Sequence, residues 1–132
     1  HDVVVTSGTR LWDLYGHADA IRLRFRHRYE VNPDHIERIE KHGMVFSGRA
    51  PEQPIMQVLE LPTNVHPFFM ATQAHCELTS RPLDPEPMFF GLVRSALAYS
   101  GAAVPESGIR LPRSELHHER PNEAANGIAQ PQ

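Results

Sequence analysis

Cysteine, strong net charge and long apolar runs are all scarce in this sequence. Cys76 is the only cysteine among 132 residues, which excludes an internal disulfide framework and suits a reducing compartment. The formal net charge of -3 provides no general attraction to nucleic acid or to an anionic membrane surface. No apolar run approaches the length that spans a bilayer. We therefore predict a cytoplasmic protein with neither a nucleic-acid partner nor a membrane partner.

The length and the distribution of residue types indicate one domain followed by a tail. A chain of 132 residues suffices for one modest domain. It opens on His1 and runs directly into a strand-like segment, so we expect a piece of a longer protein that begins inside a domain. Apolar periodicity extends over residues 1–100, which we assign to the domain. Between residues 101 and 132 Pro, Gly, Asn, Glu and Gln dominate, which predicts a disordered C-terminal tail.

The periodicity within residues 1–100 predicts an α/β fold with a central sheet and flanking helices. Apolar segments predict strands at residues 2–6, 21–31, 44–47, 55–61 and 68–74. Helical spacing predicts helices at residues 9–15, between an Asn32 N-cap and Gly43, and from an Asp84-Pro85-Glu86 cap to Leu97. The run 68–74 is the most apolar strand, so we place it at the centre of the sheet.

Residues 21–31 alternate between apolar and charged side chains, which is typical of a strand with one buried face. The charged face carries Arg22, Arg24, Arg26, Arg28 and Glu30. A solvated strand face is the plain interpretation of this basic stripe. The alternatives are a clamp for a carboxylate or phosphate, which guanidinium groups match in geometry, and an interface with an acidic partner domain.

His75 and Glu77 stand two residues apart at the end of the apolar run. Residues two apart on a strand point the same way, so both side chains are expected on one face. A carboxylate beside an imidazole fixes its tautomer and stabilises the imidazolium that forms when the ring takes a proton. The pair therefore supplies two thirds of a nucleophile–His–acid triad, with the nucleophile missing. The plain alternative is a histidine satisfied in the core or at the surface.

Cys76 is the only thiol, yet we do not assign it as the nucleophile. Adjacent strand side chains point to opposite faces, so Cys76 should diverge from His75, and an isolated cysteine is often simply buried. A zinc-deaminase interpretation of His-x-Glu needs a later Pro-Cys-x-x-Cys, and no cysteine follows Cys76. No other spacing of His, Cys and Asp suggests a metal site, so we predict no metal ligands.

Several short motifs follow one another at a characteristic spacing, namely Leu14-Tyr15-Gly16, Arg26-His27-Arg28-Tyr29-Glu30-Val31-Asn32-Pro33, Ser47-Gly48, Glu60-Leu61-Pro62, His66-Pro67-Phe68-Phe69, Thr72-Gln73-Ala74-His75-Cys76-Glu77, Ser80-Arg81-Pro82 and Pro87-Met88-Phe89-Phe90-Gly91-Leu92-Val93. In this order they resemble the C-terminal part of CTP synthases. The resemblance covers residues 1–100 and leaves the tail outside. The Arg-His-Arg-Tyr-Glu-Val-Asn run is specific to this family, whereas His-x-Glu alone indicates only the wider class I amidotransferases.

Members of that family make CTP from UTP with ATP and glutamine. The resemblance implies part of a class I glutamine amidotransferase domain, flavodoxin-like with three layers, that hydrolyses glutamine with a Cys–His–Glu triad. It implies that His75 is the triad base, that Glu77 orients it, and that Arg28 holds the L-glutamine substrate. It further implies an N-terminal synthetase domain as partner, in which ATP and magnesium act, so no cofactor is expected in this segment. The family is homo-oligomeric, so a tetramer is expected.

The sequence departs from the family pattern at three places. Cys76 replaces the usual proline, and because proline restricts the residue before it, its loss should loosen the imidazole. Phe25 stands where the family usually has histidine, and Arg22 and Leu23 stand where it has acids. No Gly-x-Cys-x-Gly nucleophile elbow occurs, so this chain alone is predicted to be inactive.

Two other interpretations remain open at this point. One is that the chain belongs to a different class I amidotransferase or to a γ-glutamyl hydrolase, and the Arg-His-Arg-Tyr-Glu-Val-Asn run argues against both. The chain is also compatible with a non-catalytic, amidotransferase-like binding module, which the missing nucleophile and the Pro-to-Cys change allow.

Overall fold

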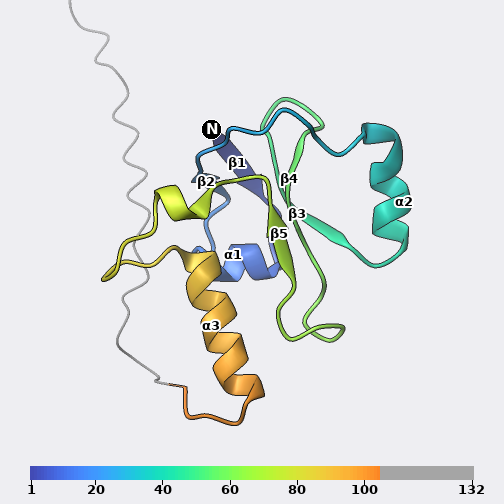
Figure 1. Ribbon diagram of the computed structural model, residues 1–132. Coiled ribbons are helices and arrows are strands. Elements are labelled where there is room, and N and C mark those ends of the chain that lie inside the picture. The colour runs from blue at the N-terminus through green and yellow to red at the C-terminus, as the bar shows by residue number, and fades with distance from the viewer. Residues whose placement is uncertain (105–132) are drawn as a thin grey trace, which may run out of the picture.

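The computed structural model describes residues 1–104, which form a five-stranded sheet with the strand order β2-β1-β3-β4-β5 (Figure 1). Every pairing in this sheet is antiparallel. The elements in chain order are β1 (Asp2–Val5), α1 (Arg10–Leu14), β2 (Ala20–Arg22), a 3-10 turn (Pro33–His35), α2 (Ile36–Lys41), β3 (Val45–Arg49), β4 (Met56–Glu60), β5 (Met70–Thr72), a second 3-10 turn (Cys76–Leu78) and α3 (Pro87–Tyr99). The predicted α/β fold with a central sheet and flanking helices is confirmed.

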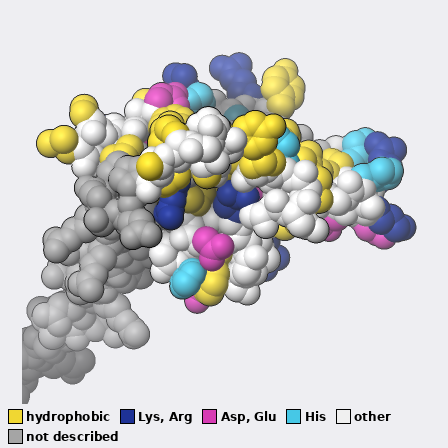
Figure 2. Space-filling view, turned by 90° about the horizontal axis from the view of Figure 1, so that it is seen from below, with side chains coloured by type: hydrophobic (Ala, Val, Ile, Leu, Met, Phe, Trp, Pro, Cys, Tyr) yellow, Lys and Arg dark blue, Asp and Glu magenta, His cyan; other side chains and the backbone are white. Residues whose placement is uncertain are grey.

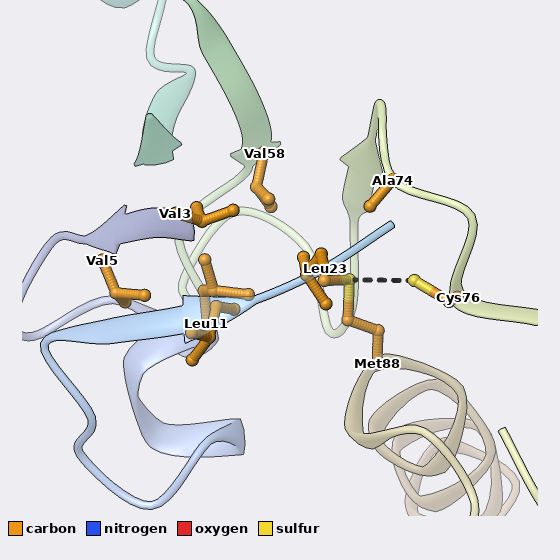
Figure 3. Close-up of a cluster of buried hydrophobic side chains, with 9 residues drawn as sticks. Val3, Val5, Leu11, Leu23, Val58, Ala74, Cys76 and Met88 are labelled. Atoms are coloured by element: carbon orange, nitrogen blue, oxygen red, sulfur yellow. Dashed lines mark hydrogen bonds between the residues drawn. The ribbon is translucent and has the colours of Figure 1, made fainter. Parts of the chain in front are cut away.

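The core lies where β1, β2 and β4 meet α1 and the start of α3. Val3 and Val5 of β1 point inward, as the alternation of a strand with one buried face requires. They pack with the other buried apolar side chains Leu11, Ile21, Leu23, Val58, Ala74, Cys76 and Met88 (Figure 3). The core therefore extends to Cys76, directly beside the predicted site residue His75.

Helix α1 is held at its start by a buried carboxylate. Glu60, at the end of β4, is only 3% exposed, and it accepts hydrogen bonds from the backbone N–H groups of Arg10 at 2.7 Å and Leu11 at 3.1 Å. Thr9 is the N-cap, and its hydroxyl accepts from the Trp12 N–H at 3.3 Å. These contacts satisfy backbone donors that a helix start leaves unpaired, and they attach α1 to the sheet.

Helix α3 has Glu86, the last residue of the predicted cap, as its N-cap. The Glu86 carboxylate accepts from the Met88 N–H at 2.9 Å and from the Tyr15 hydroxyl, and Pro87 occupies the first turn. Gly91 lets α3 approach α1 closely, since a Cβ there would lie 2.7 Å from Leu14 Cδ2. The helix still leaves apolar side chains such as Val93 exposed, and the view from below shows hydrophobic groups among charged ones (Figure 2).

Helix α2 stands away from the core in the connection between β2 and β3 (Figure 1). As predicted, Asn32 caps the start of this segment, and its side chain accepts from the Asp34 N–H at 3.0 Å. The first turn is a 3-10 turn, and neither it nor α2 contains a buried residue. Ile36 and Ile39, the predicted inward stripe, are half-buried.

The predicted strand 21–31 is wrong in length. Only its first residues lie in β2, and Arg22 opposite Asp2 is the last pair of the β2–β1 ladder. Beyond that, the chain returns to the sheet through one bridge, between Phe25 and Ala74. A strand continues only where a neighbouring backbone continues the ladder. The alternation itself persists, because Ile21 and Leu23 are buried whereas the four arginines, Arg22, Arg24, Arg26 and Arg28, are exposed.

The predicted central position of the run 68–74 is also wrong. It forms only the short β5, which lies at the edge of the described sheet. The centre is β3, where Ser47 and Gly48 are buried. A Cβ on Gly48 would lie 2.8 Å from Val3 Cγ1 and 2.9 Å from a Val58 methyl. Valine side chains of β1 and β4 thus cover the small residues of β3. The central strand is therefore not the most apolar one, and apolarity did not identify it.

Helix α3 ends at a left-handed glycine, Gly101, with φ 74°, and the Ala102 N–H donates back to the Leu97 carbonyl at 3.1 Å. Residues 105–132, most of the predicted tail, lie outside the described residues. Among residues 1–104, no helix has both the length and the apolarity needed to cross a membrane.

Candidate active site

The backbone carries His75 to the rim of the sheet just after β5. The bridge between Ala74 and Phe25 and a hydrogen bond from the His75 N–H to the Arg24 carbonyl at 2.9 Å hold this point of the chain. His75 is then the N-cap of the 3-10 turn Cys76–Leu78. The predicted site therefore lies where the β5 segment meets the basic segment that follows β2.

The structure brings His75 and Glu77 together. The Nδ1 atom of His75 lies 2.7 Å from Oε1 of Glu77, and the two side chains are 29% and 54% exposed. The hydrogen bond with His75 is the main cause that lowers the pKa of Glu77, with a further contribution from the nearby Arg26 charge. The expected contact is present, but a 3-10 turn produces it and not the two-residue period of a strand.

Arg26 approaches the other nitrogen of the same ring. Its Nε–H donates to Nε2 of His75 at 3.1 Å, although the two residues are 49 positions apart. The sequence identified Arg26 only as one member of a basic stripe. Nothing in the local pattern distinguished it from its neighbours, because its partner is set by the return of the chain at β5.

Arg28 lies farther along the same segment and is exposed. The Tyr29 carbonyl next to it accepts from the Gln73 side chain at 3.2 Å, which ties this segment to the chain just before His75. Within residues 1–104 no ion pair or hydrogen bond joins Arg28 to His75 or Glu77. The predicted substrate-binding residue Arg28 is thus an exposed residue on a segment that is tied to the chain just before His75.

Cys76 lies in the core, away from this surface cluster. It is 4% exposed, and its Sγ lies 3.8 Å from Sδ of Met88 (Figure 3). Burial, followed by the charge of Glu77, raises the pKa of the Cys76 thiol, which works against the thiolate that a nucleophile requires. Cys76 occupies the first position of the 3-10 turn, where a proline is also accommodated.

The described residues offer no metal site. No group of three or more His, Cys, Asp and Glu side chains among residues 1–104 is placed to hold an ion. The chemistry that the arrangement supports is proton transfer by an imidazole that is oriented at both nitrogens.

Comparison with known proteins assigns this arrangement to a class. Residues 4–95 match the family model of class-I glutamine amidotransferases, and the chain belongs to this family. Among its relatives are the CTP synthases of Acidothermus cellulolyticus, 43% identical over 105 residues, and of Archaeoglobus fulgidus, 49% identical over 98 residues. These alignments cover 80% and 74% of this chain but only 19% and 18% of the relatives, so the chain spans less than a fifth of their length.

A solved structure agrees with these sequence relatives. The glutaminase domain of Trypanosoma brucei CTPS, with bound acivicin, superposes with a TM-score of 0.65 at 29% sequence identity. The match covers 84% of this chain and 44% of that chain. The resemblance to CTP synthases therefore holds in sequence and in fold.

Proposed function

We propose that this chain is the C-terminal part of the glutaminase domain of a CTP synthase. The domain hydrolyses glutamine, and the ammonia is used to aminate UTP to CTP in a synthetase domain that lies outside this chain. ATP and magnesium act in that second domain. We further propose that the whole protein is cytoplasmic and forms a homo-tetramer, as the family resemblance implies.

In this proposal His75 is the general base and acid of glutamine hydrolysis. A cysteine outside this chain transfers its proton to His75, and its sulfur attacks the carboxamide carbon of glutamine. His75 then gives the proton to the departing ammonia, while Glu77 holds the ring and stabilises the imidazolium. Water, deprotonated by His75, next cleaves the thioester to glutamate and the proton returns to the cysteine sulfur. Arg28 binds the α-carboxylate of the substrate.

The 2.7 Å contact between His75 Nδ1 and Glu77 Oε1 is the observation that carries this proposal. It assigns Nδ1 to the acid, so that Nε2, which the Arg26 Nε–H occupies in this structure, is the nitrogen that serves the reacting group once Arg26 withdraws. The burial of Cys76 supports the corresponding assignment that the nucleophile comes from elsewhere.

The test compares two sources of nitrogen in the complete protein that carries this segment. His75→Ala should abolish CTP synthesis from glutamine but spare synthesis from added ammonia, which bypasses the amidotransferase site. Glu77→Gln should cost less than His75→Ala, because orientation is weakened while the base remains. Loss of both activities to the same extent would contradict the proposed roles, and full glutamine use by the His75 variant would favour a non-catalytic module.

The isolated chain provides a second test. It should release no ammonia from glutamine, because it carries no nucleophile elbow. Turnover that disappears in a Cys76→Ser variant would overturn the assignment of Cys76 as a buried core residue.

A further inference from the structure

We propose that Arg26 is a positioning residue that locks His75 in a single tautomer, with the proton on Nδ1 and the lone pair on Nε2. In its bearing on catalysis this inference rests on the proposed function, since the lock matters only if His75 is the base. The tautomer itself is a property of the folded chain and is tested without any reaction.

The direction of the two hydrogen bonds determines the tautomer. A guanidinium is protonated at all ordinary pH values and carries only donors, so the 3.1 Å contact from Arg26 Nε requires a lone pair on Nε2 of His75. The proton of the neutral ring must then sit on Nδ1, which donates to the Glu77 carboxylate at 2.7 Å. The two neighbours therefore specify the same tautomer from opposite sides of the ring.

Arg26 adds what Glu77 alone does not provide. Glu77 is more than half exposed, so its hold on the ring competes with water. A second, charge-assisted bond, from Arg26 Nε to Nε2, holds the ring from its other side and fixes the ring plane.

The lock also implies a motion during the reaction. Nε2 accepts a proton only after Arg26 has released it, because one lone pair serves one donor. The proton comes from the nucleophilic thiol, and the guanidinium keeps its own protons throughout. Arg26 is exposed, so its side chain is free to withdraw after substrate has bound, as the thiol proton reaches Nε2.

The decisive experiment measures the tautomer of His75 by ¹⁵N chemical shifts of the ring in the full 132-residue chain. The spectra are recorded at a pH where imidazoles are neutral, about 8.5. Replacing Glu77 by Gln removes the acceptor preference at Nδ1, since an amide both donates and accepts. With Arg26 present, Glu77→Gln should keep the pyrrole-type shift at Nδ1 and the pyridine-type shift at Nε2.

The matched variants assign that result to Arg26. In the Glu77→Gln background, Arg26→Met should lose the pyridine-type shift at Nε2, whereas Arg26→Lys, which retains a charged donor, should preserve it. Arg24→Met is the control, because Arg24 holds His75 through its backbone carbonyl. Amide spectra report whether each variant remains folded, and the exposed positions of Arg26 and Glu77 favour that outcome.

Two results would overturn the lock. One is a switch to the other tautomer in Glu77→Gln alone, and the other is an unchanged Nε2 shift in the Arg26→Met, Glu77→Gln double variant. In the complete protein, Arg26→Met should lower kcat with glutamine without raising KM, and an increase in KM alone would make Arg26 a substrate ligand. If the tautomer data hold but His75→Ala retains glutamine use, the proposed function fails and the lock stands.

Discussion

The sulfur atoms of Cys76 and Met88 lie 3.8 Å apart inside the core, so the one thiol of the chain is buried, whereas the side chain of the preceding His75 is 29% exposed (Figure 3). Met88 belongs to the first turn of α3, and Cys76 opens the 3-10 turn that carries Glu77. The contact therefore packs the first turn of α3 against the 3-10 turn that carries Glu77. A substitution at Cys76 or Met88 should disturb the packing of both turns.

The buried thiol should react slowly with alkylating agents. Only the thiolate is nucleophilic, and burial both raises the pKa of Cys76 and blocks access to it. Iodoacetamide labelling followed by mass spectrometry should show little modification of the native chain and complete modification in denaturant. Rapid labelling of the native chain would place Cys76 at the surface and contradict the geometry described here.

Glu86 should make stability depend on pH. Burial raises the pKa of Glu86 to about 7, above the reference value of 4.5 expected for the unfolded chain. Between these two values the folded state binds more protons, so this contribution to the free energy of unfolding falls as the pH rises and is lost above the folded-state pKa. The loss is on the order of a few kcal/mol.

The check on Glu86 is a urea titration of the wild type and of Glu86→Gln below and above this window. The variant has no ionisable group at this position. Its free energy of unfolding relative to that of the wild type should therefore be higher above the window than below it. Glu52→Gln, at an exposed loop position, is the control and should leave the pH dependence unchanged. Parallel pH profiles of the wild type and Glu86→Gln would rule out the buried carboxyl as the cause.

Alanine substitutions at the adjacent positions Ser47 and Gly48 of the central strand β3 should differ in their effect on stability. Gly48→Ala inserts a methyl against Val3 and Val58, at distances of 2.8 and 2.9 Å, and should destabilise the fold by about 1–3 kcal/mol. Ser47→Ala removes a buried hydroxyl that has no hydrogen-bond partner among the described residues, so it should be neutral or stabilising. Equal thermal midpoints for both variants would contradict the packing of β3.

Arg28→Ala should weaken the use of glutamine in the complete protein and spare synthesis from ammonia. Loss of a charge-assisted carboxylate contact costs about 2–5 kcal/mol when the remaining charge is desolvated, and here it should appear mainly in KM. Steady-state kinetics with both nitrogen sources measure the effect, and Arg24→Ala serves as the matched control. A comparable fall in both activities would identify Arg28 as structural.

Much of the fold was predictable because its signals are local. Near neighbours in the sequence determine the N-caps Asn32 and Glu86. The apolar period determines the alternating burial of Ile21 and Leu23. The extent of β2 and the edge position of β5 were not predictable in this way. Both depend on which backbone segment lies alongside, and the bridge partner of Phe25 is Ala74, 49 positions later.

By itself, the sequence determined the family, through motifs at fixed spacing, and the proximity of His75 to Glu77, which stand two positions apart. The catalytic roles of His75, Glu77 and Arg28 remain predictions. Only the tertiary structure decided that Arg26, among four similar arginines, meets the Nε2 atom of His75, and that Glu86 meets the Tyr15 hydroxyl 71 positions away. The physical reason is that such contacts depend on how separate segments return to one place, which local periodicity does not encode.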